Sequence, residues 1–158
     1  MQESSNNNEK LEIISAVFRD GSPIPPQYTC IGQNVNPPLN FFNVPPKTLS
    51  MTLIMHDPDA PGGDYLHWLV WDIPPSTEGI AVNSVPIGAL QGLNDAGKAG
   101  YQGPCPPSGT HRYIFDVYAL DSPLNLPPNS TIQDVIKAQK GHMLDHAALT
   151  GLFTAKQA

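Results

Sequence analysis

Three carboxylates, two prolines and a histidine lie within one short stretch, residues 57–68, which reads DPDAPGGDYLHW. A second stretch, residues 103–113, reads GPCPPSGTHRY and places a histidine and a tyrosine directly after proline and glycine turns. Carboxylates and imidazoles can bind an anion, hold a metal ion or transfer protons. Proline restricts its own backbone and that of the residue before it. The two stretches therefore indicate a preformed polar pocket rather than a mobile surface loop.

The pocket requires strands that bring the two stretches together. Many of the 18 prolines fall in pairs between apolar runs and divide the chain into short segments. Four of these segments are rich in β-branched or aromatic residues and are bounded by turn formers, which predicts strands. The expected strands are 11–18, 49–56, 67–73 and 112–120. Two of them lie in almost continuously apolar runs, 49–55 and 66–73, which favours central strands buried on both faces.

Side chains alternate between the two faces of a strand, so sequence parity predicts which polar residues meet. Asp57 and His56 point to opposite faces at the end of one strand. His67 begins the next strand, and we expect it beside Asp57 if the two strands form a hairpin. The same parity assigns Leu69 and Trp71 to the face of His67. One end of the sheet is therefore expected to carry both polar residues.

The later strand begins with His111 and Tyr113 on one face and Arg112 on the other. This parity predicts a single cavity surrounded by Asp57, His67, His111 and Tyr113. Imidazoles donate to an anion and gain charge when it binds, and a neighbouring carboxylate fixes their tautomer and raises their pKa. The tyrosine hydroxyl adds a neutral donor. We expect a small, rigid pocket that holds one anionic group.

The two cysteines, Cys30 and Cys105, each lie in a loop rich in proline or glycine and form no C-x-x-C pair, which excludes common zinc-ribbon and thioredoxin patterns. A disulfide between the two loops and two unpaired thiols are equally compatible with the sequence. The turn at 103–109 could offer the backbone N–H groups of Cys105, Ser108 and Gly109 to an anion.

Composition limits the classes of protein to which the chain could belong. Its 158 residues, 40% of them hydrophobic, suit one domain over residues 11–158, after a polar and disordered tail over residues 1–10. The net charge of -6, without a cluster of Lys or Arg, argues against binding of nucleic acid. No run of about 18 apolar residues predicts a membrane span. We expect a soluble protein, cytoplasmic or periplasmic, with no signal peptide in the chain as given.

The C-terminal region predicts the helical part of a mainly β fold. Ser130 is the expected N-cap of a helix, with Gln133 placed for a capping box and Gly141 near the helix end. Residues 142–148 suggest a second short helix, and residues 149–154 a final strand. The predicted architecture is therefore a β-sheet protein with one or two short C-terminal helices.

The two stretches resemble the signature regions of the phosphatidylethanolamine-binding protein family, also called Raf kinase inhibitor-like proteins. The first corresponds to the family's D-P-D-A-P followed by an aromatic residue and a histidine, and the second to its G-x-x-P-P-x-G-x-H-R-Y. The resemblance covers about residues 11–154. Residues 28–30, 36–39 and 113–120 look most like the compact bacterial and archaeal members, the YbhB/YbcL-like branch.

The resemblance implies a large central sheet, a smaller sheet packed on it and short C-terminal helices. It also implies a pocket for phosphate, acetate-like ions or phosphorylated head groups, with no cofactor and no metal. The residues that match the family's pocket are Asp57, Asp59, His67, His111 and Tyr113, with Tyr65 at the rim and Cys105 before the double proline. The implied function is a non-enzymatic binding protein, which could also regulate a kinase or protease through the pocket rim.

Two enzymatic alternatives use the same residues. A metal-dependent hydrolase would hold a divalent ion with ligands chosen from His56, Asp57, Asp59, Asp64 and His67, although Pro58 and Pro61 hinder their convergence. A metal-free hydrolase would use Ser108 as nucleophile, with Asp57 and His67 or His111 as acid and base, but the G-x-S-x-G elbow is missing.

The remaining histidines suggest structural roles or none. His56 and His142 are expected to orient neighbouring loops, and Gly141-His142 matches a Gly-His pair that the resembling family carries at a helix junction. His146 and residues 137–140 look like an ordinary solvated helix face. We predict no functional role for that face.

Overall fold

The computed structural model describes residues 9–156, and the chain forms two β-sheets with one α-helix beside them. Most of the predicted tail, residues 1–8, lies outside the described part. The strands are β1 (Glu12–Ile14), β2 (Ser22–Pro23), β3 (Leu39–Phe42), β4 (Ser50–Asp57), β5 (Tyr65–Ile73), β6 (Gly79–Ile80), β7 (Leu90–Gln91), β8 (Thr110–Leu120) and β9 (Met143–Thr154). The helices are the 3-10 helix η1 (Pro26–Tyr28) and α2 (Ile132–Gln139).

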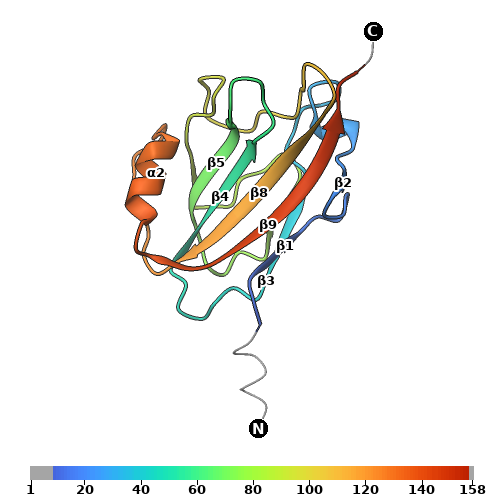
Figure 1. The fold of residues 1–158 in the computed structure, drawn as a ribbon. Coiled ribbons are helices and arrows are strands. Elements are labelled where there is room, and N and C mark those ends of the chain that lie inside the picture. Colours follow the sequence, from blue (N-terminus) through green and yellow to red (C-terminus); the bar gives the residue numbers. More distant parts are fainter. Residues whose placement is uncertain (1–8, 157–158) are drawn as a thin grey trace.

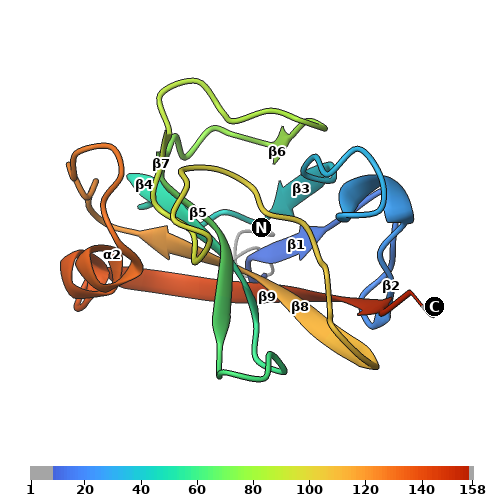
Figure 2. The same ribbon diagram turned by 90° about the horizontal axis from the view of Figure 1, so that it is seen from above.

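The larger sheet has the strand order β2-β9-β8-β4-β5-β7, and the smaller has the order β1-β3-β6. All pairs are antiparallel except β2 with β9. Figure 2 shows the smaller sheet above one face of β8 and β9, and both views place α2 at one side of the larger sheet (Figures 1 and 2). The predicted mainly β fold, with a large sheet packed on a smaller one, is confirmed.

The core has two parts because β4 and β5 are buried on both faces, as their apolar sequences predicted. Between the sheets, Leu53 and Met55 of β4 pack in the same cluster as Leu39 of β3 and Phe115 of β8. On the other face, a smaller cluster lies under the helix and consists of Ile54, Leu66, Leu69, Trp71 and Val135. Burial of these side chains supplies the main driving force for folding.

The predicted second helix at 142–148 is wrong, because residues 143–148 form the first half of the long strand β9. Met, Leu and Ala are good helix formers, so the local sequence favours a helix. However, β9 pairs with β8 along its whole length, from Thr110 opposite Thr154 to Leu120 opposite Met143. This pairing satisfies backbone groups that β8 would otherwise leave exposed at a sheet edge. His146 therefore lies on a strand, not on a helix face.

The helix α2 begins one residue later than predicted. Thr131, not Ser130, is the N-cap: its side chain accepts a hydrogen bond from the backbone N of Asp134 at 3.2 Å. The Asp134 carboxylate accepts from the backbone N of Thr131 at 3.0 Å, which completes a capping box. Ser130 is buried and donates to the carbonyl oxygen of Pro127 at 2.7 Å. No helix within residues 9–156 is long and apolar enough to cross a membrane.

A disulfide joins Cys30, just after η1, to Cys105 in the loop before β8, with 5.5 Å between the Cα atoms. The sequence left this pairing open. The backbone N of Cys30 also donates to the carbonyl oxygen of Pro104 at 3.1 Å. The disulfide and this hydrogen bond hold two loops together that are 75 residues apart in the chain.

Replacing both cysteines with serine should lower the free energy of unfolding by roughly 4 kcal/mol, because the disulfide closes a long loop and restricts the unfolded chain. Chemical denaturation of the wild type and of the C30S/C105S variant measures the difference. Under reducing conditions the two proteins should unfold at the same denaturant concentration. Equal stability of the wild type with and without reductant would contradict this expectation.

Candidate functional site

A cavity of about 250 Å³ lies where the ends of β4, β5 and β8 meet the loop that precedes β8. This loop and the loop after β4 supply prolines to the cavity wall. Of the residues that the sequence predicted for the pocket, the cavity is lined by Asp57, Tyr65, His67, Cys105, His111 and Tyr113. The structure therefore brings the two sequence stretches to one place, the first from the connection between β4 and β5 and the second from the loop before β8 and the start of β8.

A β-bulge in β5 decides where His67 points. Met55 of β4 pairs with Trp68, whereas His56 pairs with Leu66, so His67 is an extra residue in the register. Trp68 then packs in the core between the sheets, while Leu69 packs in the cluster under α2. The prediction that His67 shares a face with Leu69 and Trp71 is wrong, because the bulge interrupts the alternation. His67 nevertheless reaches the cavity that contains Asp57.

Asp57 is almost fully buried, with an exposed fraction of 3%. Its Oδ1 accepts a hydrogen bond from the backbone N of Asp59 at 2.8 Å, and its Oδ2 lies 2.7 Å from Nδ1 of His111. A carboxylate only accepts, so the proton in the second contact belongs to His111 Nδ1. Asp57 therefore fixes the tautomer of His111, and Nε2 is left for a ligand.

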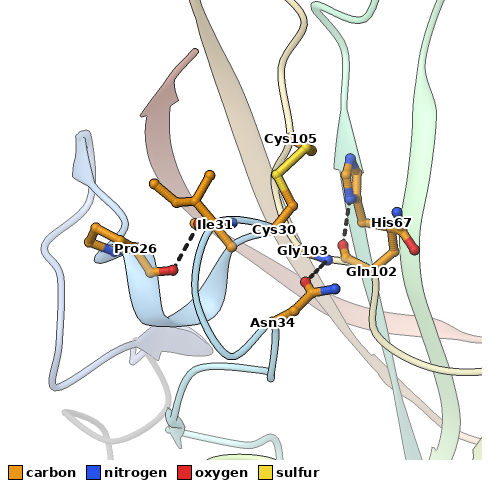
Figure 3. Close-up of a disulfide and its surroundings, with 9 residues drawn as sticks. Pro26, Cys30, Ile31, Asn34, His67, Gln102, Gly103 and Cys105 are labelled. Atoms are coloured by element: carbon orange, nitrogen blue, oxygen red, sulfur yellow. Dashed lines mark hydrogen bonds between the residues drawn. A yellow bond between two sulfur atoms is a disulfide. The ribbon is translucent and has the colours of Figure 1, made fainter. Parts of the chain in front are cut away.

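His67 is oriented in the same way by the protein backbone. Its Nδ1 lies 2.6 Å from the carbonyl oxygen of Gln102, to which it must donate (Figure 3). Burial lowers the pKa of His67 below its ordinary value of 6.5 and outweighs the opposing effects of Gln102 and Asp57. The prediction that a neighbouring carboxylate raises the pKa of His67 above its ordinary value is therefore wrong. Within residues 9–156, no hydrogen bond reaches Nε2 of His67 or of His111.

Tyr113 lies between the two imidazoles. Its ring meets that of His67 edge to face, with 5.2 Å between centroids, and stacks on that of His111 at 6.4 Å. Burial, assisted by the charge of Asp57, raises the pKa of Tyr113, so its hydroxyl stays protonated and can donate. Tyr65 also packs against His67, with 4.9 Å between ring centroids. The aromatic contacts fix both histidine rings.

The wall opposite the strands is held by close backbone packing. The backbone N of Gly103 donates to Oδ1 of Asn34 at 2.9 Å, and the disulfide lies beside this contact (Figure 3). A Cβ atom at position 103 would collide with Asn34 and with the backbone of Tyr28 and Thr29, so only glycine fits. Cys105, in the same loop, lines the cavity. The loop around residue 30 therefore supports the pocket from behind.

Asp59, the remaining predicted pocket residue, does not line the cavity. Its carboxylate accepts from Nε of Arg112 at 3.0 Å and from Nη2 at 2.8 Å. Its Oδ2 also accepts from the backbone N of Arg112 at 2.9 Å. Arg112 lowers the pKa of Asp59 to about 2, so the carboxylate is ionised at neutral pH. Asp59 thus ties the loop after β4 to the start of β8, and its place is structural.

The two enzymatic alternatives find little support in this arrangement. Ser108 is exposed and does not line the cavity that contains the candidate bases Asp57, His67 and His111. Gly109 is likewise exposed and outside the lining. Over residues 9–156, no three His, Cys, Asp or Glu side chains converge as a metal site. The proposed metal ligands are also divided, because His56 and Asp64 line a different cavity from Asp57 and His67.

A network of hydrogen-bonded histidine and aspartate side chains that the sequence did not predict lies on the other face of the sheet. Nδ1 of His56 contacts Asp64 at 2.8 Å, and its Nε2 contacts Asp116 of β8 at 2.7 Å. The second oxygen of Asp116 contacts Nε2 of His146 at 2.6 Å. The bond to Asp116, with help from Asp64 and against the effect of burial, raises the pKa of His56 to about 9. The strand register accounts for this network, because Asp116 lies opposite Ile54 of β4 and Ala148 of β9. His56 and His146 are each two residues from these partners and therefore lie diagonally opposite Asp116 on the same face.

The network confirms neither a catalytic nor a metal function for His56. Its contact between His56 of β4 and Asp64 joins the two ends of the loop between β4 and β5, on the face of the sheet opposite the cavity. His142 contacts Asp121 at 2.8 Å, where the loop after α2 meets the end of β8. Both placements agree with the structural roles that the sequence suggested for these two histidines.

Fold and cavity together define a class: a two-sheet β protein with a small polar pocket at the ends of three neighbouring strands. The family model for the phosphatidylethanolamine-binding protein matches residues 14–154. The chain therefore belongs to the phosphatidylethanolamine-binding protein family, which confirms the family assigned from the two motifs.

Relatives match nearly the whole chain. The UPF0098 protein of Methanothermobacter thermautotrophicus is 47% identical over 148 residues, which cover 90% of this chain and 98% of that protein. A UPF0098 protein of Pyrococcus horikoshii is 43% identical over 157 residues and covers 94% of this chain and 79% of its own.

Two solved structures share the fold. A phosphatidylethanolamine-binding protein homologue of Chlamydia trachomatis has a TM-score of 0.90 and 38% identity, and the match covers 93% of this chain and 99% of that one. YbcL of E. coli, described as a new member of the mammalian family, has a TM-score of 0.87 and 30% identity, with coverage of 94% and 100%.

The raised pKa of His56 predicts how stability depends on pH. The folded-state pKa of about 9 exceeds the unfolded value of 6.5, so the stabilisation is fully present below pH 6.5 and is lost as the pH rises through 9. The difference in unfolding free energy between the wild type and the H56Q variant should therefore be larger at pH 6 than at pH 10. Urea denaturation at both pH values measures it. A difference that does not change with pH would contradict the prediction.

Proposed function

We propose that the chain is a non-enzymatic binding protein whose pocket holds one small anionic group, either free phosphate or the phosphate of a head group. The observation that carries this proposal is the pair of imidazoles with the same arrangement: Nδ1 of His67 and of His111 lies against an acceptor, and Nε2 has no hydrogen-bond partner among the described residues. The protonated hydroxyl of Tyr113 adds a third donor in the same cavity.

The charges in the pocket indicate how the anion would be accommodated. Asp57 is a buried acceptor, and it disfavours a second negative charge unless a positive charge balances it. A neutral imidazole that donates through Nδ1 presents only an acceptor at Nε2. An imidazole in this pocket can therefore donate to an anion through Nε2 only when both of its ring nitrogens carry protons. Binding of the anion is accordingly coupled to proton uptake, mainly at His67, whose pKa is lowered in the empty pocket.

The size of the cavity favours a single group over a whole lipid. Its volume of about 250 Å³ lies at or below the lower end of the usual range for small-molecule pockets, which is roughly 300–1,000 Å³. The rim residues Pro61, Pro106 and Tyr65 offer apolar surface to the carbon atoms next to a phosphate ester. A phosphorylated head group fits this combination, with the remainder of the molecule in solvent.

The finer assignment within the family is also proposed. Full-length similarity to YbcL of E. coli supports a place among the compact prokaryotic members, the YbhB/YbcL-like branch, although archaeal and chlamydial proteins are also close relatives. No described residue of the pocket rim favours a kinase or protease as partner. The proposal therefore concerns the small anion alone.

Replacing His111 with alanine should weaken phosphate binding by at least about tenfold, because the change removes one donor and leaves Asp57 buried without its partner. Titration with inorganic phosphate and with phosphoethanolamine, followed by NMR of the histidine side chains, measures the affinity. H142A is the matched control, since His142 is exposed and lies outside the cavity. The proposal fails if neither titrant shifts His67 and His111 in the millimolar range.

Anion affinity should fall as the pH rises, because the bound pocket must hold a proton that free His67 lacks. Sulfate is the probe for this test, since it does not titrate near neutral pH as phosphate does. Its dissociation constant should rise from pH 5.5 to 8 by up to about tenfold per unit. Calorimetry in buffers of different ionisation enthalpy should show proton uptake on binding. A dissociation constant that is independent of pH, without proton uptake, would contradict the coupling.

A further inference from the structure

A disulfide forms part of the wall of the anion pocket. Cys105 lines the cavity, and its partner Cys30 lies in the loop that supports the pocket from behind. Figure 3 shows the disulfide beside Gly103 and near the contact between Gln102 and His67. Both cysteines are exposed, and accessible disulfides exchange with thiolates from solution. The pocket therefore contains one group whose covalent state can change.

The disulfide is the principal attachment of residues 105–108, which we call the wall segment. Just before this segment, the carbonyl oxygen of Pro104 accepts from the backbone N of Cys30 at 3.1 Å. Just after it, the carbonyl oxygen of Gly109 accepts from the backbone N of Ala155 at 2.8 Å. Between these points, no backbone–backbone hydrogen bond joins the wall segment to another described residue. The segment is therefore held mainly through the sulfur of its first residue.

The wall segment contributes directly to the anion pocket. Cys105, Pro106 and Pro107 line the same cavity as His67 and Tyr113. The backbone of Cys105 also hydrogen-bonds to the hydroxyl of Tyr113, which opposes the rise that burial causes in the pKa of this tyrosine. Displacement of the wall segment would admit water to His67 and Tyr113. The rigid, closed pocket, and with it the low ordering cost of binding, therefore depends on the disulfide.

Reduction would loosen the wall segment and leave the preceding part of the loop in place. The backbone N of Gln102 donates to the carbonyl oxygen of His67 at 2.9 Å. The backbone N of Gly103 donates to Oδ1 of Asn34 at 2.9 Å. Neither hydrogen bond involves sulfur, so both remain when the disulfide is cleaved. Because the chain has 2 cysteines, reoxidation within one chain can restore only the same pairing, and the change is reversible.

We propose that the disulfide is a redox switch of the anion pocket: reduction by a dithiol releases the wall segment and weakens binding of the anion. A thiolate of the reductant attacks one sulfur to form a mixed disulfide, and the other sulfur leaves as a thiolate that takes up a proton. The second thiol of the reductant then displaces the first protein sulfur. The protein thus gains two electrons and two protons, and the reductant becomes a disulfide. The inference rests on the proposed function, because it concerns the regulation of the same pocket.

The first test compares the sulfate affinity of the oxidised wild type, the wild type reduced with dithiothreitol, and the C30S/C105S variant. The protein is reduced at about pH 8, where thiolates form, and is titrated without oxygen at about pH 5.5. The reduced wild type should bind sulfate about tenfold or more weakly than the oxidised protein, and C30S/C105S should match the reduced form. Reoxidation should restore the affinity. Equal affinities of the oxidised and reduced proteins would overturn the proposal.

The second test asks whether the folded protein is reduced. The rate of reduction by dithiothreitol should change little with urea below the unfolding transition, because an accessible disulfide needs no unfolding. A rate that rises steeply with urea would mean that unfolding comes first, and the switch would be wrong. Methyl signals of Leu53 and Val117, both buried in the core, report whether the reduced protein stays folded. Unfolding on reduction would equally refute the switch.

A readout that needs no anion separates failure of the switch from failure of the proposed function. The pKa of His67, followed by NMR, should rise towards 6.5 on reduction, because water reaches the ring. If neither form binds sulfate although this pKa rises, the proposed function is wrong and the release of the wall segment is supported. A pKa of His67 that is the same in both forms, with sulfate bound by the oxidised protein, would overturn the switch alone.

Discussion

The pairing of β4 with β5 on one side and β8 on the other is the constraint on which both cavities depend. β4 is buried on both faces, and its residues alternate between the core under the small sheet and the cluster under α2. His56 and Asp57 are neighbours in sequence, yet they serve opposite faces of the sheet. Any slip of this strand by one residue would exchange the two sets of side chains. The register of β4 therefore determines the chemistry on each face.

The histidines show how burial changes the role of a side chain. His56 is more exposed than His67, and the carboxylates of Asp64 and Asp116 hold it in the charged form. His67 has only a carbonyl as direct partner, and the charges of Asp57 and Asp95 have smaller effects, so desolvation dominates and favours the neutral form. The same residue type is thus a fixed cation in one place and a group that can gain a proton in the other.

The sequence predicted most of the fold and most of the pocket, and its errors have physical causes. Proline punctuation and apolar runs located the four long strand regions, although the first shortened to Glu12–Ile14. Parity placed His111 and Tyr113 correctly because β8 is regular through both residues. It failed along β5, since a bulge at His67 depends on pairing with β4 and leaves no local signal. The strand at 143–148 was missed for a similar reason, because its partner β8 overrides helix propensity.

The interlocked backbone at Gly103 limits which sequence changes the pocket can tolerate. Where two side chains are in contact, a larger residue at one position can be offset by a smaller one at the other. A side chain at position 103 would meet the side chain of Asn34, and it would also meet the backbone of Tyr28, which is present whatever residue occupies position 28. No second substitution can therefore restore the space. A side chain at position 103 could be accommodated only if the backbones of both loops moved apart, and not by a change of side chain at position 28.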